Sequence, residues 1–157
     1  MVRSDFQGSL NLGRISKIQT FLPFPNFEKS AQCLDKKRLW KQCLESWQLL
    51  RVLSGETTNR WINHPACIMW KGYEDALQEY LNVCLIEWRN RGGKNNSISI
   101  TTDTRNIDII LPPWFGDDRF HRSHRSNLLH KDYEYYFKYF DDVPLDLPYF
   151  WPSQNGY

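Results

Sequence analysis

Apolar residues that recur every three or four positions between residues 66 and 88 place the strongest limit on how this chain folds. This spacing puts them on one face of an amphipathic helix. They are Ala66, Trp70, Tyr73, Leu77, Tyr80, Leu81, Cys84 and Trp88. Asn63 and Pro65 form a strong helix start, and Gly92 with Gly93 forms a strong stop. The sequence therefore predicts a long core helix from Asn63 to about Arg91.

A second long helix is predicted from Asn26, a good N-cap, to about Leu53. Its apolar residues form two sets on roughly opposite faces: Phe27, Ala31 and Leu34 on one, and Trp40, Cys43, Trp47 and Leu50 on the other. At about 100° per residue, a polar stripe continues the first face. The stripe consists of Arg38, Lys41 and Glu45, with Gln42 beside them. We therefore expect protein to cover both sides of this helix, with the stripe facing a cleft.

The remaining chain predicts less regular structure. A third helix begins at Asp117 or Asp118 and ends near Leu129, and Asp132 caps one or two further turns that end by Phe140. Residues 93–113 form a long polar loop, in which residues 107–111 fit one short strand. The predicted fold class is mainly α, a compact single domain of three to four helices with long irregular loops. We expect this domain to extend over residues 19–157, after a flexible N-terminal arm at residues 1–18.

Length and composition exclude several classes of protein. A chain of 157 residues can form one domain without a stabilising metal or disulfide. No stretch approaches the ~18 consecutive apolar residues of a membrane span. The first residues also lack the apolar segment of a secretory signal. The four cysteines form no CxxC pair, so we expect them to be reduced and buried in an intracellular protein, cytoplasmic or nuclear.

The polar stripe on the predicted second helix is the first candidate site. One carboxylate among basic side chains can orient a water molecule or stabilise a developing cation. Glu45 would supply the carboxylate, and Arg38 and Lys41 the positive charge. A solvated helix face with ion pairs between neighbouring turns is the alternative interpretation.

The second candidate site lies in the predicted third helix, where basic residues and histidines alternate with serines. Phosphate and sugar contacts in nucleic-acid complexes use these residue types. The candidate ligands of DNA here are His121, Arg122, His124, Arg125 and Asn127. Two alternatives stay open: an ordinary exposed helix, and a metal site formed by His121, His124 and His130, which lacks an obvious carboxylate partner.

Several enzyme motifs are missing from the chain. It contains no P-loop, GxGxxG, GxSxG or HExxH pattern. This disfavours nucleotide hydrolysis, dinucleotide redox chemistry, serine-hydrolase chemistry and zincin chemistry. The net charge of +2 is too small to indicate nucleic acid by itself, but a basic run at residues 119–131 precedes an acidic segment at residues 132–151.

Three ordered blocks of the sequence resemble the pyrimidine-dimer DNA glycosylase family. They are QTFLPFPNFEKSAQCLDKKRLWKQCLE at residues 19–45, NHPA with MWKGYEDAL at residues 63–77, and LPPWFGDDRFHRSHRSNLLHKDYEYY at residues 111–136. The resemblance implies a mainly helical base-excision enzyme that binds double-stranded DNA and flips out a nucleotide. It further implies amine attack at the sugar C1′, an imine intermediate, an abasic-site lyase activity, and no metal or organic cofactor.

The resemblance also assigns roles to individual residues. Asp35 and Glu45 stand at the spacing of the family's aspartate and essential glutamate, so Glu45 is the expected catalytic carboxylate, with Thr20 and Gln19 near the sugar. The expected ligands of DNA are Lys36, Arg38, Lys41, Gln42, His64, His121, Arg122, His124, Arg125 and Asn127. For His64, a purely structural role at the helix start is equally open. We expect a monomer that requires no protein partner.

The chain departs from the family at two places. An arginine that commonly precedes the glutamate is replaced, because Cys43 and Leu44 occupy those positions. In a phage member the nucleophile is the α-amine of the first residue, whereas Gln19 here follows eighteen residues. An α-amine has a pKa of roughly 8 and a lysine one near 10.4, so the α-amine is the better nucleophile at neutral pH.

Four sources of the attacking group therefore stay open. The arm can fold back and deliver its own terminus, or it can be absent from the active form. Glu45 can instead activate water in an enzyme without the lyase step, or Lys17 or Lys41 can attack with a lowered pKa. Excision of another modified base and a non-catalytic DNA-binding module are the alternative functions.

Overall fold

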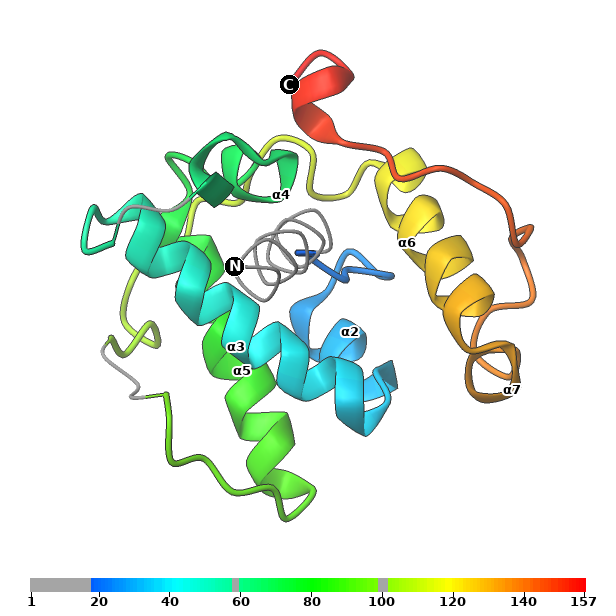
Figure 1. Ribbon diagram of the computed structural model, residues 1–157, viewed down its shortest axis with the longest axis horizontal. Coiled ribbons are helices and arrows are strands. Elements are labelled where there is room, and N and C mark those ends of the chain that lie inside the picture. Colours follow the sequence, from blue (N-terminus) through cyan, green and yellow to red (C-terminus); the bar gives the residue numbers. More distant parts are fainter. Residues whose placement is uncertain (1–17, 58–59, 99–101) are drawn as a thin grey trace, which may run out of the picture.

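The computed structural model describes residues 18–57, 60–98 and 102–157, and within these ranges it is helical and contains no strand (Figure 1). Four longer α-helices and four short helical segments occur there. The longer ones are α2 (Phe27–Cys33), α3 (Lys36–Leu53), α5 (Glu74–Asn90) and α6 (Asp118–Lys131). The short ones are η1 (Arg60–Asn63), α4 (Pro65–Ile68), α7 (Tyr133–Tyr136) and η2 (Pro152–Gln154). The prediction of a mainly α fold is confirmed.

Helices α3 and α5 form the central pair of the fold (Figure 1). Their facing apolar side chains are buried, among them Leu39, Cys43, Leu77 and Cys84. Near one end of the pair the rings of Trp40 and Trp88 pack 4.9 Å apart between centroids. All four cysteines are free and buried, as the sequence predicted.

The predicted helix from Asn26 to Leu53 is two helices, so its predicted continuity is wrong. Asn26 does cap α2, but Leu34 and Asp35 are extended, with ψ of 138° and 159°. The guanidinium of Arg91, at the end of α5, donates to the carbonyl oxygens of Ala31, Gln32 and Leu34 around the end of α2. These bonds from a distant residue satisfy the backbone at the break, which local periodicity does not reveal.

The predicted helix from Asn63 to Arg91 is also divided. His64, and not Asn63, is the cap of α4, because its Nδ1 accepts from the backbone nitrogen of Ala66 at 3.0 Å. The chain then turns at Gly72, whose φ of +87° is reached most easily without a side chain. α5 begins two residues later and carries the apolar face that the sequence predicted.

α6 and α7 agree with the predicted third helix and last turns, whereas the strand predicted at residues 107–111 does not form. Residues 141–151, called here the C-terminal strap, run along α6 (Figure 1). Ser126 Oγ accepts from the Leu147 nitrogen at 3.0 Å, and Ser123 Oγ accepts from the Phe150 nitrogen at 3.1 Å. The predicted arm lies outside the described residues except for Ile18, which is buried. None of the described helices is long and apolar enough to cross a membrane.

Candidate active site

An extended segment at residues 18–23 lies between α3 and α6 and organises the candidate site (Figure 1). Its backbone cannot use helical hydrogen bonds, so side chains must satisfy it. Gln42 of α3 accepts from the nitrogen of Phe21 at 2.8 Å and donates to the carbonyl of Gln19 at 2.9 Å. Tyr80 of α5 donates to the carbonyl of Phe21 at 2.6 Å. The Gln42 amide is fully buried, and here it holds the segment in place.

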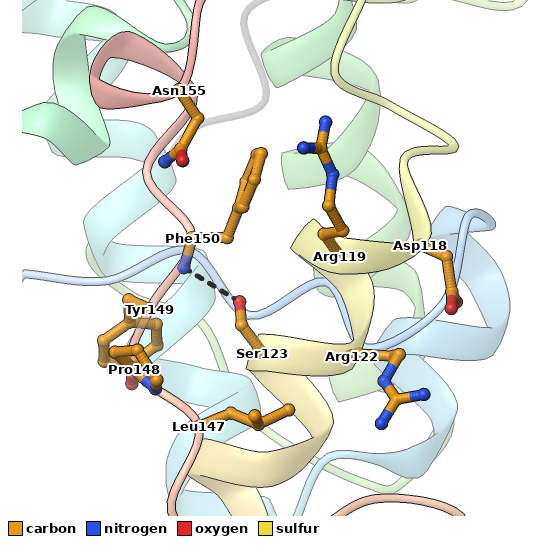
Figure 2. Close-up of a pocket in the computed structure, with 9 residues that line it drawn as sticks. All are labelled: Asp118, Arg119, Arg122, Ser123, Leu147, Pro148, Tyr149, Phe150 and Asn155. Carbon is orange, nitrogen blue, oxygen red and sulfur yellow. Dashed lines mark hydrogen bonds between the residues drawn. The ribbon is translucent and has the colours of Figure 1, made fainter.

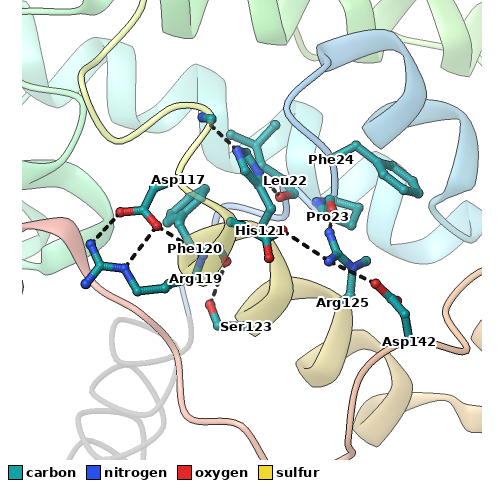
Figure 3. Close-up of polar contacts among 12 residues, drawn as sticks. Leu22, Pro23, Phe24, Asp117, Arg119, Phe120, His121, Ser123, Arg125 and Asp142 are labelled. Carbon is teal, nitrogen blue, oxygen red and sulfur yellow. Dashed lines mark hydrogen bonds and ion pairs between the residues drawn. The ribbon is translucent and has the colours of Figure 1, made fainter.

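Two histidines of α6 hold the same segment from the opposite side. His124 Nδ1 accepts from the Leu22 nitrogen at 3.0 Å. His121 Nε2 accepts from the Gly116 nitrogen at 2.9 Å, so its Nδ1 carries the proton and donates to the Leu22 carbonyl at 2.7 Å (Figure 3). Burial lowers the pKa of His121, and lowers that of His124 to about 3, so both rings are neutral at physiological pH.

Arg125 completes this framework on α6. Its Nη1 donates to the carbonyl of Pro23 at 2.8 Å, and its Nη2 donates to Asp142 of the strap at 3.2 Å (Figure 3). The side chain is buried, so its charge is used to join the segment to the strap. Asn127 also contacts the strap, because its Nδ2 donates to the Leu147 carbonyl at 3.1 Å.

Glu45 belongs to α3, and its carboxyl group lies beside the start of segment 18–23. Only 7 % of it is exposed, and its Oε2 accepts from the backbone nitrogen of Gln19 at 3.3 Å. Lys41 Nζ lies 3.8 Å from Oε1, one helical turn away. Burial raises the pKa of Glu45 to about 7, although Lys41, the hydrogen bond from Gln19 and Lys131 lower it. A carboxyl group of this kind can both give and take a proton near neutral pH.

Gln19 and Thr20, at the start of segment 18–23, are both buried. Their side chains have different surroundings. Thr20 Oγ1 accepts from Trp70 Nε1 at 3.0 Å, so the hydroxyl belongs to the core. Gln19 Oε1 is buried and makes no hydrogen bond with a described residue. Of the residues predicted from sequence, the structure thus brings seven together around segment 18–23: Gln19, Thr20, Gln42, Glu45, His121, His124 and Arg125.

Three further predicted residues make contacts outside segment 18–23. Lys36 is exposed, with Nζ 6.0 Å from the centre of the Trp88 ring. Arg38 Nη1 pairs with Asp35 Oδ1 at 3.3 Å. His64 caps α4 and contacts the ring of Trp151 edge-on at 5.7 Å.

An open hollow of about 510 Å³ lies between α6 and the strap (Figure 2). It is lined by Asp118, Arg119, Arg122, Ser123, Leu147, Pro148, Tyr149, Phe150 and Asn155. Arg119 is paired with Asp117 at 2.7 Å and stacks on Phe150, with 4.8 Å from Cζ to the ring centre. Arg122 forms no ion pair with any described residue, so its charge is available to an anionic ligand.

The sequence interpretation missed Tyr149. Its hydroxyl is buried without a hydrogen-bond partner among the described residues, and its ring meets His124 at 5.6 Å. Burial raises its pKa well above the usual value, Arg38 lowers it and Glu45 raises it, which places both charges within electrostatic reach of the hydroxyl. No spacing pattern could indicate this residue, because it lies on the strap near the end of the chain and meets His124 of α6 only in the folded structure.

A metal ion would need several donor side chains arranged around one point. Within residues 18–57, 60–98 and 102–157, no group of three or more histidine, cysteine, aspartate or glutamate side chains is arranged to hold a metal ion. Two of the three histidines of the alternative metal site, His121 and His124, are instead bonded to the backbone of Leu22.

Comparison with known proteins gives one match. A sequence model of the pyrimidine dimer DNA glycosylase family matches residues 18–101, which is more than half of the 157 residues. The matched part includes segment 18–23 and the whole of α3 with Glu45. Comparisons with curated proteins and with solved structures gave no match. On the strength of the family match, the chain belongs to the pyrimidine dimer DNA glycosylase family.

Proposed function

We propose that this protein excises a damaged pyrimidine, a cyclobutane dimer, from double-stranded DNA with Glu45 as the catalytic carboxylate. The observation that supports this most strongly is the state of Glu45 itself. It is a buried carboxyl group with a pKa raised to about 7, and it touches the backbone nitrogen of Gln19 at 3.3 Å. Strongly shifted carboxyl groups of this kind are typical of catalytic sites.

The chemistry of base excision suits such a group. As the C1′–base bond breaks, positive charge develops on the sugar, and a nearby carboxylate stabilises it. In its protonated form the same group can supply the proton that the departing base requires. Because the pKa of Glu45 lies near 7, both forms are well populated at neutral pH.

The attacking amine, in our proposal, occupies the position of the Gln19 nitrogen. In the full chain this nitrogen is an amide and cannot attack. In a chain that begins at Gln19 it becomes an α-amine beside Glu45, with a pKa of roughly 8. The amine then forms a bond to C1′ while the C1′–base bond breaks and the base departs with that electron pair. Glu45 takes up the amine proton and returns it to O4′ as the C1′–O4′ bond breaks, which opens the sugar ring and gives the imine. The full chain would use water activated by Glu45 and lack the lyase step.

DNA binding is assigned to the cations that solvent can reach. We propose that four side chains contact backbone phosphates: Lys36, Arg38, Lys41 and Arg122. Such contacts give affinity for DNA of any sequence. His121, His124, Arg125, Gln42 and Asn127 are proposed to act indirectly, because their polar atoms hold segment 18–23 and the strap. His64 is proposed to position α4 as its cap.

Borohydride trapping on ultraviolet-irradiated duplex DNA tests this proposal. The full chain is compared with a chain beginning at residue 19, and a version with Gln19→Ala avoids cyclisation of an N-terminal glutamine. We expect cleavage of the C1′–base bond in irradiated DNA only, scored as abasic sites because the cyclobutane ring still joins the cleaved base to its neighbour. We also expect a trapped covalent complex with the shortened chains, and loss of both in Glu45→Gln. Glu56→Gln is the matched control, since Glu56 is exposed and paired with Arg51. Salt-sensitive binding without any cleavage of the C1′–base bond would contradict the proposal and favour a non-catalytic module.

A further inference from the structure

Five buried polar side-chain atoms around segment 18–23 have no hydrogen-bond partner in the described part of the chain. One is Nε of Arg125, whose two Nη atoms hold Pro23 and Asp142. The other four are Gln19 Oε1, Glu45 Oε1, His124 Nε2 and Tyr149 Oη. Lys41 Nζ is 3.8 Å from Glu45 Oε1, which is an ion-pair distance but too long for a hydrogen bond. Buried polar groups are normally paired, so a cluster of unpaired ones indicates a site whose ligand supplies the partners.

The four atoms belong to residues that are linked by contacts. The nitrogen of Gln19 touches Glu45, and His124 bonds the same segment three residues further on, at Leu22. The Tyr149 ring packs edge-on against His124, with 5.6 Å between centroids and 79° between planes. Figure 2 shows this ring leaving the strap on the side away from Arg119. The contact with His124 therefore joins Tyr149 to the site, and the charges of Glu45 and Arg38 also affect the pKa of its hydroxyl.

The polarity of these atoms indicates the class of ligand. His124 Nδ1 accepts from Leu22, so its free Nε2 carries a proton and is a donor. The Tyr149 hydroxyl is also a donor, because its pKa is raised well above the usual value and it stays protonated. The oxygens of Glu45 and Gln19 are acceptors. A phosphate offers acceptors only and would be repelled by the carboxylate, whereas a sugar offers both hydroxyl donors and oxygen acceptors.

We propose that Tyr149 completes a deoxyribose subsite at Glu45, where its hydroxyl donates a hydrogen bond to an oxygen of the sugar whose base is removed. This inference rests on the proposed function, because the sugar is that of the damaged nucleotide. The family match covers residues 18–101, which include Glu45 but not Tyr149. Tyr149 is therefore a residue of the C-terminal strap that joins a site formed mostly by the matched residues. Ser123 and Ser126 fix the strap on both sides of Tyr149 through the nitrogens of Phe150 and Leu147.

The variant Tyr149→Phe tests the proposal because it removes only the hydroxyl and keeps the ring contact with His124. We expect the single-turnover rate of base excision at saturating protein to fall roughly tenfold, the effect of one lost hydrogen bond to the reacting sugar. We expect unchanged affinity for undamaged duplex DNA and a thermal midpoint that is equal or higher, since a buried unpaired hydroxyl is removed. Tyr133→Phe is the matched control, because Tyr133 is 55 % exposed.

The outcomes separate this inference from the proposed function when Glu45→Gln is measured in parallel. If Glu45→Gln abolishes excision and Tyr149→Phe retains the full rate, the inference is overturned and the proposed function stands. A lower thermal midpoint in Tyr149→Phe, with a rate loss that disappears on cooling, would assign the hydroxyl a structural role and also overturn the inference. Absence of excision by the unmodified protein and its shortened forms would overturn both.

Discussion

The backbone nitrogen of Gln19 lies 3.3 Å from Oε2 of Glu45, although 26 positions separate the two residues along the chain. Glu45 belongs to α3 and Gln19 to the extended segment that Gln42, Tyr80, His121 and His124 hold in place. The fold thus brings a main-chain nitrogen to a buried carboxyl group. In the proposed mechanism this is the position from which an amine attacks the sugar.

The first prediction concerns the stability of Glu45→Gln. The pKa of Glu45 is about 7 in the folded chain and near 4.5 in the unfolded chain, so between these pH values the folded state holds a proton that the unfolded state has lost. Stability must therefore fall as pH rises from 4.5 to 7, by at most about 3 kcal/mol. The variant has no ionisable group at this position and does not lose this stability. Its free energy of unfolding, relative to that of the unmodified protein, should therefore increase between pH 4.5 and pH 7. Urea denaturation at pH 5 and pH 8 measures the free energy of unfolding of both proteins. If the variant and the unmodified protein differ by the same amount at both pH values, the prediction is contradicted.

The second prediction concerns Lys41→Met. Lys41 lowers the pKa of Glu45, so its removal should raise that pKa. If the carboxylate form is needed for the reaction, the midpoint of the single-turnover rate against pH should move to higher pH. Lys37→Met is the control, because Lys37 is an exposed neighbour on α3 and should leave the midpoint unchanged. If the rate has the same pH midpoint in all three proteins, ionisation of Glu45 does not determine the pH dependence of the reaction.

The third prediction concerns Gln42→Leu. Gln42 bonds the nitrogen of Phe21 and the carbonyl of Gln19, and leucine would leave both groups buried without these partners. We expect a loss of about 2–4 kcal/mol in the free energy of unfolding, measured by chemical denaturation. Gln32→Leu, at an exposed position, should cost less than about 0.5 kcal/mol. A small loss at Gln42 would show that segment 18–23 does not depend on it.

The fourth prediction concerns acid stability and His124. Its pKa is about 3 in the folded chain because burial disfavours the charged ring, and near 6.5 in the unfolded chain. The unfolded state binds the proton first on acidification, so this group costs stability as pH falls below 6.5. In His124→Gln the free energy of unfolding should decline less between pH 6.5 and pH 5 than in the unmodified protein. Parallel declines in the two proteins would contradict the depressed pKa.

Local sequence signals predicted which parts of the chain are helical but not where the helices break. The apolar periodicity of α5 and the capping residues Asn26 and Asp117 identify their helices, because both signals are local. The break at Leu34 and Asp35 depends on Arg91, which is more than fifty residues away in sequence. Such a tertiary contact leaves no mark in the helical period of α2 and α3.

The candidate site was predicted unevenly for the same reason. Glu45 and Gln42 share a helix face, so spacing alone groups them. On α6, a helix rich in charge and histidine indicates an exposed surface, whereas His121, His124 and Arg125 are buried and bonded to residues 22–23. The roles of those residues are decided by which backbone groups need partners, and that is known only once segment 18–23 is placed. Tyr149 carried no local signal.

The most direct test of the account is mass spectrometry of the borohydride-trapped complex between irradiated duplex DNA and a chain that begins at residue 19, with chelator present. We expect the DNA to be attached to the α-amine of residue 19, and we expect Glu45→Gln in the same chain to prevent trapping. Attachment at a lysine side chain, or an unchanged yield with Glu45→Gln, would contradict the proposed pairing of the residue 19 amine with the Glu45 carboxylate.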